Sequence, residues 1–257
     1  LFDMNYVWIS AAGLCGSTIL GALLGFGIKK VPHKWNDTIL GFCAGMMLAA
    51  AILGLIVPAM EGANVINNNF GWLLVVAGVM IGALFLNVLD AVTPHLHTIT
   101  GLDAEEHKSN ASLNKVLLFV MAIAIHKLPE GIAAGVGFNS ENLTNALSVT
   151  IGISFQNIPE AMVIITPLLI AGVSKKRTLA ISFAIALLEV VGVWIGYAMG
   201  AVSQTFLPIM LAFAGGCMLY IVSDEMIPET HSHGHQKMAT YALLIGFLTL
   251  MMIEQGV

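Results

Sequence analysis

Charged side chains are scarce in this sequence. Asp, Glu, Lys and Arg make up 10% of its 257 residues, against about 25% in a soluble domain. Hydrophobic residues make up 58%, and the mean hydropathy is +0.89. This composition excludes an ordinary soluble protein and predicts one that crosses a membrane several times. The small net charge of −5 gives no indication of a nucleic-acid partner.

Two further absences exclude particular classes of protein. Cys15, Cys43 and Cys217 are the only cysteines, and all three lie inside apolar runs. We therefore expect packing residues and not a disulfide framework. The H-E-x-x-H motif of zinc proteases is also missing, so the sequence gives no support to an intramembrane protease, and we expect no enzyme.

Apolar segments long enough to span a membrane recur along the whole chain. A spanning helix needs about 20 mainly apolar residues, and the sequence offers eight candidates. Because a bundle of such helices packs as one unit, we predict an all-α membrane protein with a single domain over residues 1–257. The candidates are residues 6–28, 38–60, 70–93, 115–137, 143–171, 177–200, 203–223 and 238–256.

The basic residues predict the orientation of these segments. Apart from Lys127, every Lys and Arg lies beside a connection that follows an odd-numbered segment, and the other connections have none. By the positive-inside rule, the basic connections face the cytoplasm. Both termini then face outside, and we expect a multi-pass protein of the plasma membrane. The basic residues concerned are Lys29, Lys30, Lys34, Lys108, Lys115, Lys175, Lys176, Arg177 and Lys237.

Several ionisable residues nevertheless fall inside or at the ends of the apolar segments. Each charge at the centre of a bilayer costs about 2.5–3.5 kcal/mol on insertion scales. Such groups must therefore face one another, a water-filled cavity or a cation. They are Asp90, His126, Lys127, Glu130, Glu160 and Glu189.

Two of these segments carry related motifs, A-I-H-K-L-P-E-G and S-F-Q-N-I-P-E-A. His126 and Glu130 are four residues apart, as are Gln156 and Glu160, so each pair lies on one face of a helix. A proline precedes each glutamate and removes one helical hydrogen bond, which leaves a carbonyl in need of a partner. Because consecutive segments run in opposite directions, the repeat is inverted, as at the midplane sites of many transporters.

The residue types at these positions favour a divalent transition metal. Imidazole nitrogen together with carboxylate and amide oxygen suits zinc, iron or manganese, whereas magnesium or calcium would not require the histidine. Glu189 is a natural further donor, and Met47 is a thioether whose position alone is more typical of packing. A proton-coupled carrier of an organic solute is the nearest alternative, because carboxylates and histidine also relay protons.

With these motifs, the sequence resembles the ZIP (Zrt/Irt-like) divalent-metal transporters of the bacterial and archaeal type. Further resemblance lies in G-F-C-A-G-M-M-L, in L-D-A-V-T-P-H-L-H and in S-D-E-M-I-P-E-T-H-S-H-G-H. The resemblance implies eight transmembrane helices and uptake of zinc, with cadmium, iron or manganese as possible substrates. It also implies an elevator-type motion of helices one, four, five and six against the other four, often in a homodimer.

The resemblance also implies a set of site residues. In members with two adjacent metal sites, the second site shares the two motif glutamates and adds an Asn, an Asp and a Glu. Here the three added positions are occupied by Lys127, Asn157 and Glu189. The residues that match the first site are Met47, His126, Glu130, Gln156 and Glu160.

Lys127 is the informative departure from the family pattern. A protonated ammonium has three hydrogen-bond donors and no acceptor, so it does not ligate a metal. We hypothesise that this protein binds one transported metal and that Lys127 takes the place of the second cation among Glu130, Glu160 and Glu189. The alternative is a Lys127 that points away from the site and reaches for water.

Other polar residues lie at the ends of the segments, where solvated surface is an equally good explanation for each. Glu61 is a candidate for attracting cations at the outer entrance. The remaining candidates lie on the predicted cytoplasmic side, and the alternating histidines there are typical of weak metal capture. These candidates are Asp90, His95, Asp224, Glu225, His231, His233 and His235.

Overall fold

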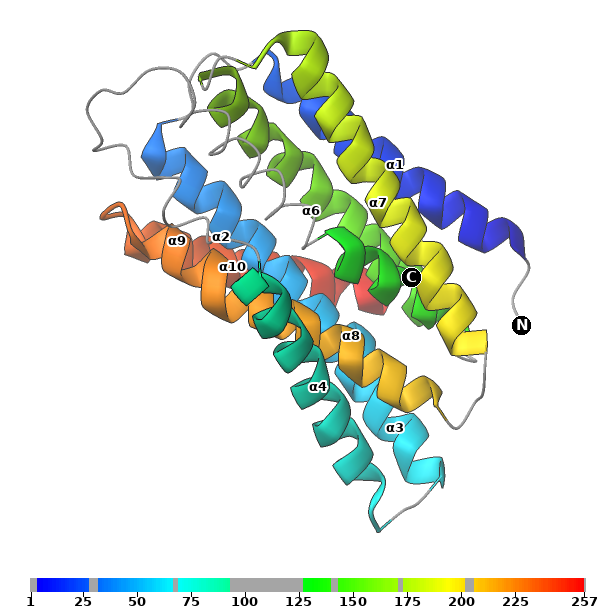
Figure 1. The fold of residues 1–257 in the computed structure, drawn as a ribbon. Helices are drawn as coiled ribbons and strands as arrows, with labels where there is room; N and C mark the ends of the chain where they lie inside the picture. Colours follow the sequence, from blue (N-terminus) through cyan, green and yellow to red (C-terminus); the bar gives the residue numbers. More distant parts are fainter. Residues whose placement is uncertain are drawn as a thin grey trace.

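A computed structural model of the chain describes residues 4–27, 32–66, 69–92, 127–139, 143–170, 173–201 and 206–256. Within these ranges, every regular element is a helix (Figure 1). Residues 127–137 are helical as well. The other helices are α1 (Met4–Gly25), α2 (His33–Ala49), α3 (Val57–Ile66), α4 (Gly71–Val92), α6 (Leu143–Ile170), α7 (Lys175–Ala201), α8 (Leu207–Ile221), α9 (Ile227–His231) and α10 (Gln236–Gly256).

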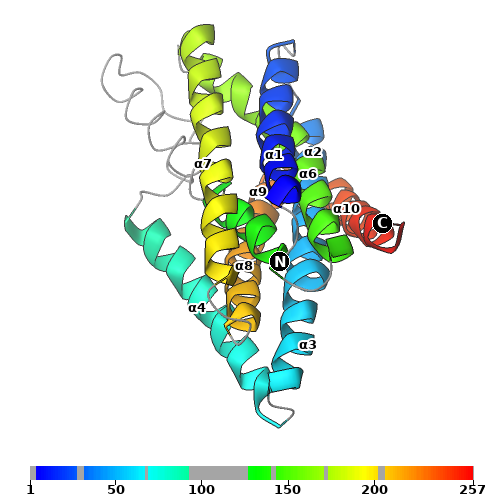
Figure 2. The same cartoon turned by 90° about the vertical axis from the view of Figure 1, so that its right-hand side faces the viewer.

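Six helical stretches are long and apolar enough to cross a membrane, so the chain is a multi-pass membrane protein. They agree with six of the predicted segments to within a few residues at most ends. Residues 127–137 form the end of the fourth predicted segment, 115–137, and α6 corresponds to the fifth, 143–171. The end of α1 and the start of α7, next to two of the basic connections, lie at the same end of the molecule (Figures 1 and 2).

The helices form two groups. In one, α1 packs against both α6 and α7. In the other, α2 packs against α10, and α4 packs against α8. The groups meet mainly where α2 contacts α6, so that the polar residues of α6 lie next to the boundary between them. Figure 2 shows α7, α1 and α6 neighbouring one another along the molecule.

A π-helical turn, Ala50–Ile56, joins α2 to α3 and makes one continuous helix from His33 to Ile66. The wider turn changes the hydrogen-bonding pattern of the backbone. One of its carbonyl groups accepts a hydrogen bond from a side chain of a neighbouring helix. The Asn145 side-chain amide donates to the Gly54 carbonyl at 2.9 Å. The sequence predicted a span of residues 38–60, with no sign of this turn.

The predicted end of the seventh segment at residue 223 is wrong. A second π-helical turn, Val222–Met226, joins α8 to α9, so the helix continues to His231. The predicted loop over 224–237 therefore shrinks to the short turn between His231 and Gln236. Charged residues do not end the helix because they lie on its outer face, while Val222 and Met226 stay buried.

Glycine allows α2 and α10 to pack backbone against backbone. A Cβ atom added to Gly45 would collide with the carbonyl oxygen of Leu243, and one added to Gly246 with that of Phe42. By contrast, a Cβ atom on Gly16 of α1 would meet nothing within 4 Å. In lipid the hydrophobic effect does not drive helices together, so close packing at small residues of this kind stabilises their association instead.

We expect Gly45→Ala to destabilise the protein by about 1–3 kcal/mol, because the added methyl group forces α2 away from α10. Gly16→Ala is the matched control, since it adds the same methyl group in open space and raises helix propensity. Thermal unfolding of the two purified variants in detergent measures the difference. Equal unfolding temperatures for both variants would contradict the close packing of α2 on α10.

Candidate functional site

Lys127 lies at the centre of a buried polar cluster. Its side chain is 1% exposed, and its ammonium nitrogen contacts three oxygen atoms from two helical segments. The distances are 2.7 Å to Glu130 Oε2, 2.6 Å to Asn157 Oδ1 and 2.7 Å to Glu160 Oε2. All three ammonium donors thus have an acceptor, and the alternative in which Lys127 points away from the site is wrong.

Glu130 and Gln156 form the next part of the cluster, and both are completely buried. The Gln156 side-chain amide donates to Glu130 Oε1 at 3.0 Å, so both oxygen atoms of Glu130 accept hydrogen bonds. The other polar atom of Gln156, Oε1, has no hydrogen-bond partner. A buried amide oxygen without a partner is costly, and it is also the kind of atom that ligates a cation.

Asn157 connects Lys127 to the third carboxylate, Glu189. While Asn157 Oδ1 accepts from Lys127, Asn157 Nδ2 donates to Glu189 Oε1 at 2.7 Å. The second oxygen of Glu189 accepts from the Thr18 hydroxyl at 3.1 Å. Ser17 lies 3.4 Å from the Asn157 amide. Glu189 is completely buried and is held by neutral donors from α1 and α6, whereas Lys127 contacts the other two carboxylates directly.

Four glycines bring the helix 127–137 and α7 into backbone contact. A Cβ atom on Gly131 or Gly135 would collide with the carbonyl oxygens of Glu189 or Val193. The matching positions on α7, Gly192 and Gly196, face carbonyl oxygens of the helix 127–137 in the same way. This packing holds the part of one helix that carries Lys127 and Glu130 beside the middle of α7, which carries Glu189.

The face of α2 next to the cluster carries two sulfur atoms. Met47 and Cys43 are one turn apart and are completely buried. The Cys43 thiol lies 3.7 Å from the Gln156 backbone oxygen, which places this face of α2 against the motif of α6. All three cysteines are free, as the sequence predicted.

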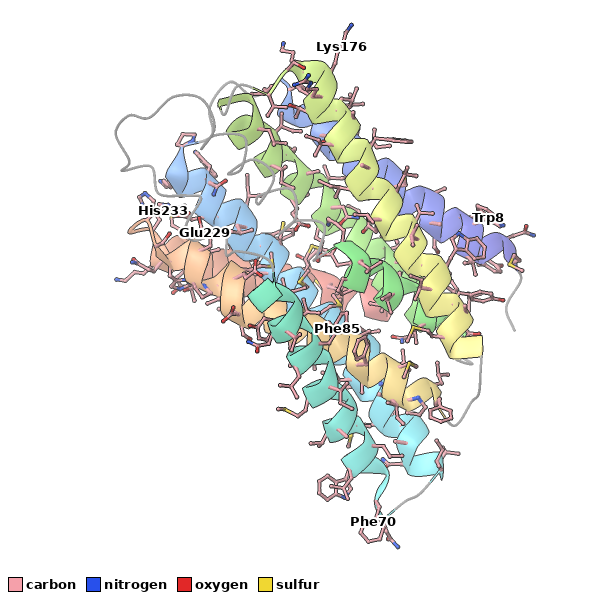
Figure 3. All side chains as sticks on the ribbon, in the orientation of Figure 1. Trp8, Phe70, Phe85, Lys176, Glu229 and His233 are labelled. Atoms are coloured by element: carbon pink, nitrogen blue, oxygen red, sulfur yellow. The ribbon has the colours of Figure 1, made fainter. Side chains whose placement is uncertain are left out.

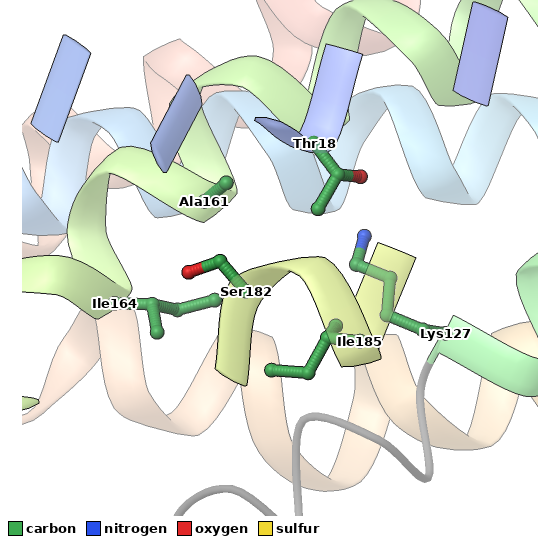
Figure 4. Close-up of a pocket in the computed structure, with 6 residues that line it drawn as sticks. All are labelled: Thr18, Lys127, Ala161, Ile164, Ser182 and Ile185. Atoms are coloured by element: carbon green, nitrogen blue, oxygen red, sulfur yellow. The ribbon is translucent and has the colours of Figure 1, made fainter. Parts of the chain in front are cut away.

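A small pocket opens beside Lys127 (Figure 4). It extends toward the end of α6 and the start of α7, the same end of the molecule at which α1 ends. Its polar lining residues are Lys127, Thr18 and Ser182, and the other three are apolar. Its lining residues are Thr18, Lys127, Ala161, Ile164, Ser182 and Ile185.

The remaining predicted residues are more scattered. Glu61 is exposed on α3. His126 and His95 lie outside the described residues, as does the side chain of Asp90. Asp224 and Glu225 lie in the second π-helical turn, with His231, His233 and His235 just beyond it.

The structure does not bring His231, His233 and His235, at the end of α9 and in the turn before α10, together as a group. His231 Nδ1 lies 2.9 Å from both the Thr230 hydroxyl and the Ile227 carbonyl. His233 instead reaches across to Asp37 of α2, with 3.0 Å between Nδ1 and Oδ1. Among the described residues, no three His, Cys, Asp or Glu side chains are arranged to hold a metal ion.

Sequence reasoning missed three polar residues that the structure places in contact with predicted ones. Ser17 and Thr18 belong to the cluster, and Asp37 pairs with His233. Two adjacent hydroxyls in the apolar run C-G-S-T-I-L were a usable signal for the first two. Asp37 was assigned to the connection before residue 38, whereas α2 begins at His33.

Comparison with known proteins identifies the family of the chain. A model of the ZIP zinc transporter family matches residues 100–254. The zinc transporter ZIPB of Bordetella bronchiseptica is 35% identical over 98% of this chain and 81% of its own length. The zinc transporter GufA of Myxococcus xanthus is also 35% identical, over 95% and 98%. Human zinc transporter ZIP11 is 28% identical over 94% of both chains. The chain therefore belongs to the ZIP family of transporters.

Proposed function

We propose that this protein transports divalent transition-metal cations, zinc above all, through the cluster around Lys127. The observation that carries the proposal is the charge of the cluster. Three ionised carboxylates and one ammonium give a formal charge of −2, which one divalent cation neutralises. Membership of a transporter family, with relatives named as zinc transporters, supports a carrier and not an enzyme.

The transported ion is held by residues from four helical segments. The free Oε1 atom of Gln156 supports its part as a ligand. Met47 is buried one turn from Cys43, whose thiol contacts the Gln156 backbone, which supports a thioether in the same region. Lys127 and Asn157 occupy the second-site positions, so that a single metal is transported. The proposed ligands are Met47, His126, Glu130, Gln156, Glu160 and Glu189, with cadmium, iron and manganese as further substrates.

Transport runs inward, toward the cytoplasm. The pocket beside Lys127 lies toward the basic connections, which supports an exit on that side. Glu61 serves the outer entrance, while Asp90, His95, Asp224, Glu225, His231, His233 and His235 serve the inner exit. Both termini then lie outside the cytoplasm.

The same proposal includes the full architecture. The protein spans the plasma membrane with eight transmembrane helices, transports its ion by an elevator-type motion and forms a homodimer. The two groups of helices support this division, because α1, α6 and α7 pack together apart from the pairs α2–α10 and α4–α8. The site lies mainly in the first group, with Met47 contributed by the second.

Uptake into proteoliposomes tests the function. Zinc, cadmium, manganese and iron are offered separately to wild type, Glu130→Ala and His126→Ala, and Lys237→Ala serves as a surface control. We expect saturable uptake by wild type and the control, and uptake at background level in both site variants. If folded wild type takes up none of the four ions, the proposal is wrong, and an organic solute carrier becomes the better reading.

A further inference from the structure

A second polar contact lies at the start of α2, away from the Lys127 cluster. Asp37 is completely buried, and its Oδ1 atom lies 3.0 Å from His233 Nδ1 in the turn before α10. The other oxygen atom, Oδ2, is buried without any hydrogen-bond partner. A buried carboxylate oxygen normally has at least one partner, and leaving it without one is unfavourable.

The sequence around Asp37 repeats the spacing of the first transport motif. H-K-W-N-D at residues 33–37 matches H-K-L-P-E at residues 126–130 in its histidine, its lysine and its final carboxylate. His33 is the first residue of α2 and lies one turn before Asp37 along the helix. The start of α2 thus repeats the histidine-to-carboxylate spacing of the first transport motif.

We propose that Asp37 and His233 form a second site for a divalent transition metal. Zinc binds imidazole nitrogen and carboxylate oxygen at about 2.0–2.2 Å. Two ligands of a tetrahedral ion are then about 3.3 Å apart, close to the observed 3.0 Å between His233 Nδ1 and Asp37 Oδ1. The metal takes the place of the proton between the two atoms, and coordination by both oxygen atoms of the Asp37 carboxylate gives Oδ2 a partner.

The position of the site suits exchange with water. His233 is 29% exposed, while Asp37 lies behind it with no exposure. Gly234, with φ of +84°, follows His233 and forms the turn that brings the ring to Asp37. Figure 3 shows His233 at the same end as the start of α2.

This site is separate from the cluster around Lys127. Asp37 and Met47 are ten residues apart on α2, which corresponds to about 15 Å along a helix. If the proposed function holds, a metal ion released from the cluster passes this site on the inner side. The binding itself does not depend on that function, because it requires only the residues at the start of α2 and in the turn before α10.

Zinc bound to the purified full-length protein in detergent, measured by equilibrium dialysis, tests the site. The experiment uses a Glu130→Ala background to weaken the Lys127 cluster. We expect one zinc ion per chain in this background, lost on adding Asp37→Asn or His233→Gln. Glu229→Gln removes the same charge from the same end of the structure (Figure 3) and is expected to keep the ion.

Two results would overturn the inference: zinc retained by both Asp37→Asn and His233→Gln, or no zinc at all in a folded Glu130→Ala protein. If the Glu130→Ala background does not fold, the same variants are made in the wild type, where each must lose one ion. Failure of the proposed transport function gives a different result, because zinc binding then persists at Asp37 while uptake is absent.

Discussion

Lys127→Met is expected to destabilise the metal-free protein strongly. The substitution preserves much of the volume of the side chain but removes the ammonium that contacts Glu130, Asn157 and Glu160. Glu130 would then be buried without its opposite charge. Breaking a buried ion pair in this way costs about 3–5 kcal/mol, because the remaining charge keeps its full desolvation penalty.

Divalent metal should rescue this variant, because a cation of higher charge can occupy the space between the same carboxylates. Thermal unfolding in detergent, with zinc and with a chelator, measures the effect. We expect zinc to raise the unfolding temperature of Lys127→Met more than that of wild type. Lys176→Met, an exposed position at the start of α7 (Figure 3), is the control. A metal-free Lys127→Met protein as stable as wild type would show that the contacts of Lys127 contribute nothing.

The second large effect is expected on metal stoichiometry. The double variant Lys127→Asn, Asn157→Asp replaces the ammonium by an amide and adds a carboxylate beside Glu189, as in the family members with two sites. The formal charge of the cluster changes from −2 to −4, and two divalent cations would neutralise it. We expect one more zinc ion per chain than in wild type.

Elemental analysis of protein equilibrated with zinc measures this difference. Each single variant is a control, since neither has the complete second set of ligands. Asn157→Asp alone should keep the wild-type stoichiometry, because Lys127 still lies among the carboxylates. An unchanged stoichiometry in the folded double variant would show that Lys127 does not substitute for a second metal ion.

The charged residues of the cluster could be predicted from the sequence because a charge is costly in lipid. Lys127, Glu130 and Glu160 had no means of staying ionised in an apolar segment except by facing one another, and the i, i+4 spacing showed which side chains share a helix face. Ser17 and Thr18 were harder to find. A hydroxyl in an apolar helix costs little, because it can bond its own backbone, as Ser17 does with the Leu14 carbonyl at 2.8 Å.

The fold was predictable to a similar degree. Segment positions follow from hydropathy, and most observed ends agree with them. The two π-helical turns have no hydropathy signal, since one additional residue in a turn changes hydrogen bonding and not composition. The burial of Asp37 was equally hidden. It depends on the turn before α10, almost 200 residues later in the chain, folding against the start of α2.

The glycine contacts between the helix 127–137 and α7 have a consequence for the precision of the proposed ion site. Where two backbones touch with no side chains between them, their spacing does not change when side chains exchange rotamers. The distance between the backbones that carry Glu130 and Glu189 is thus fixed by the main chain itself. A binding site must be held to about 0.5 Å, and at the proposed site four residues without any side chain set the distance between the two helices.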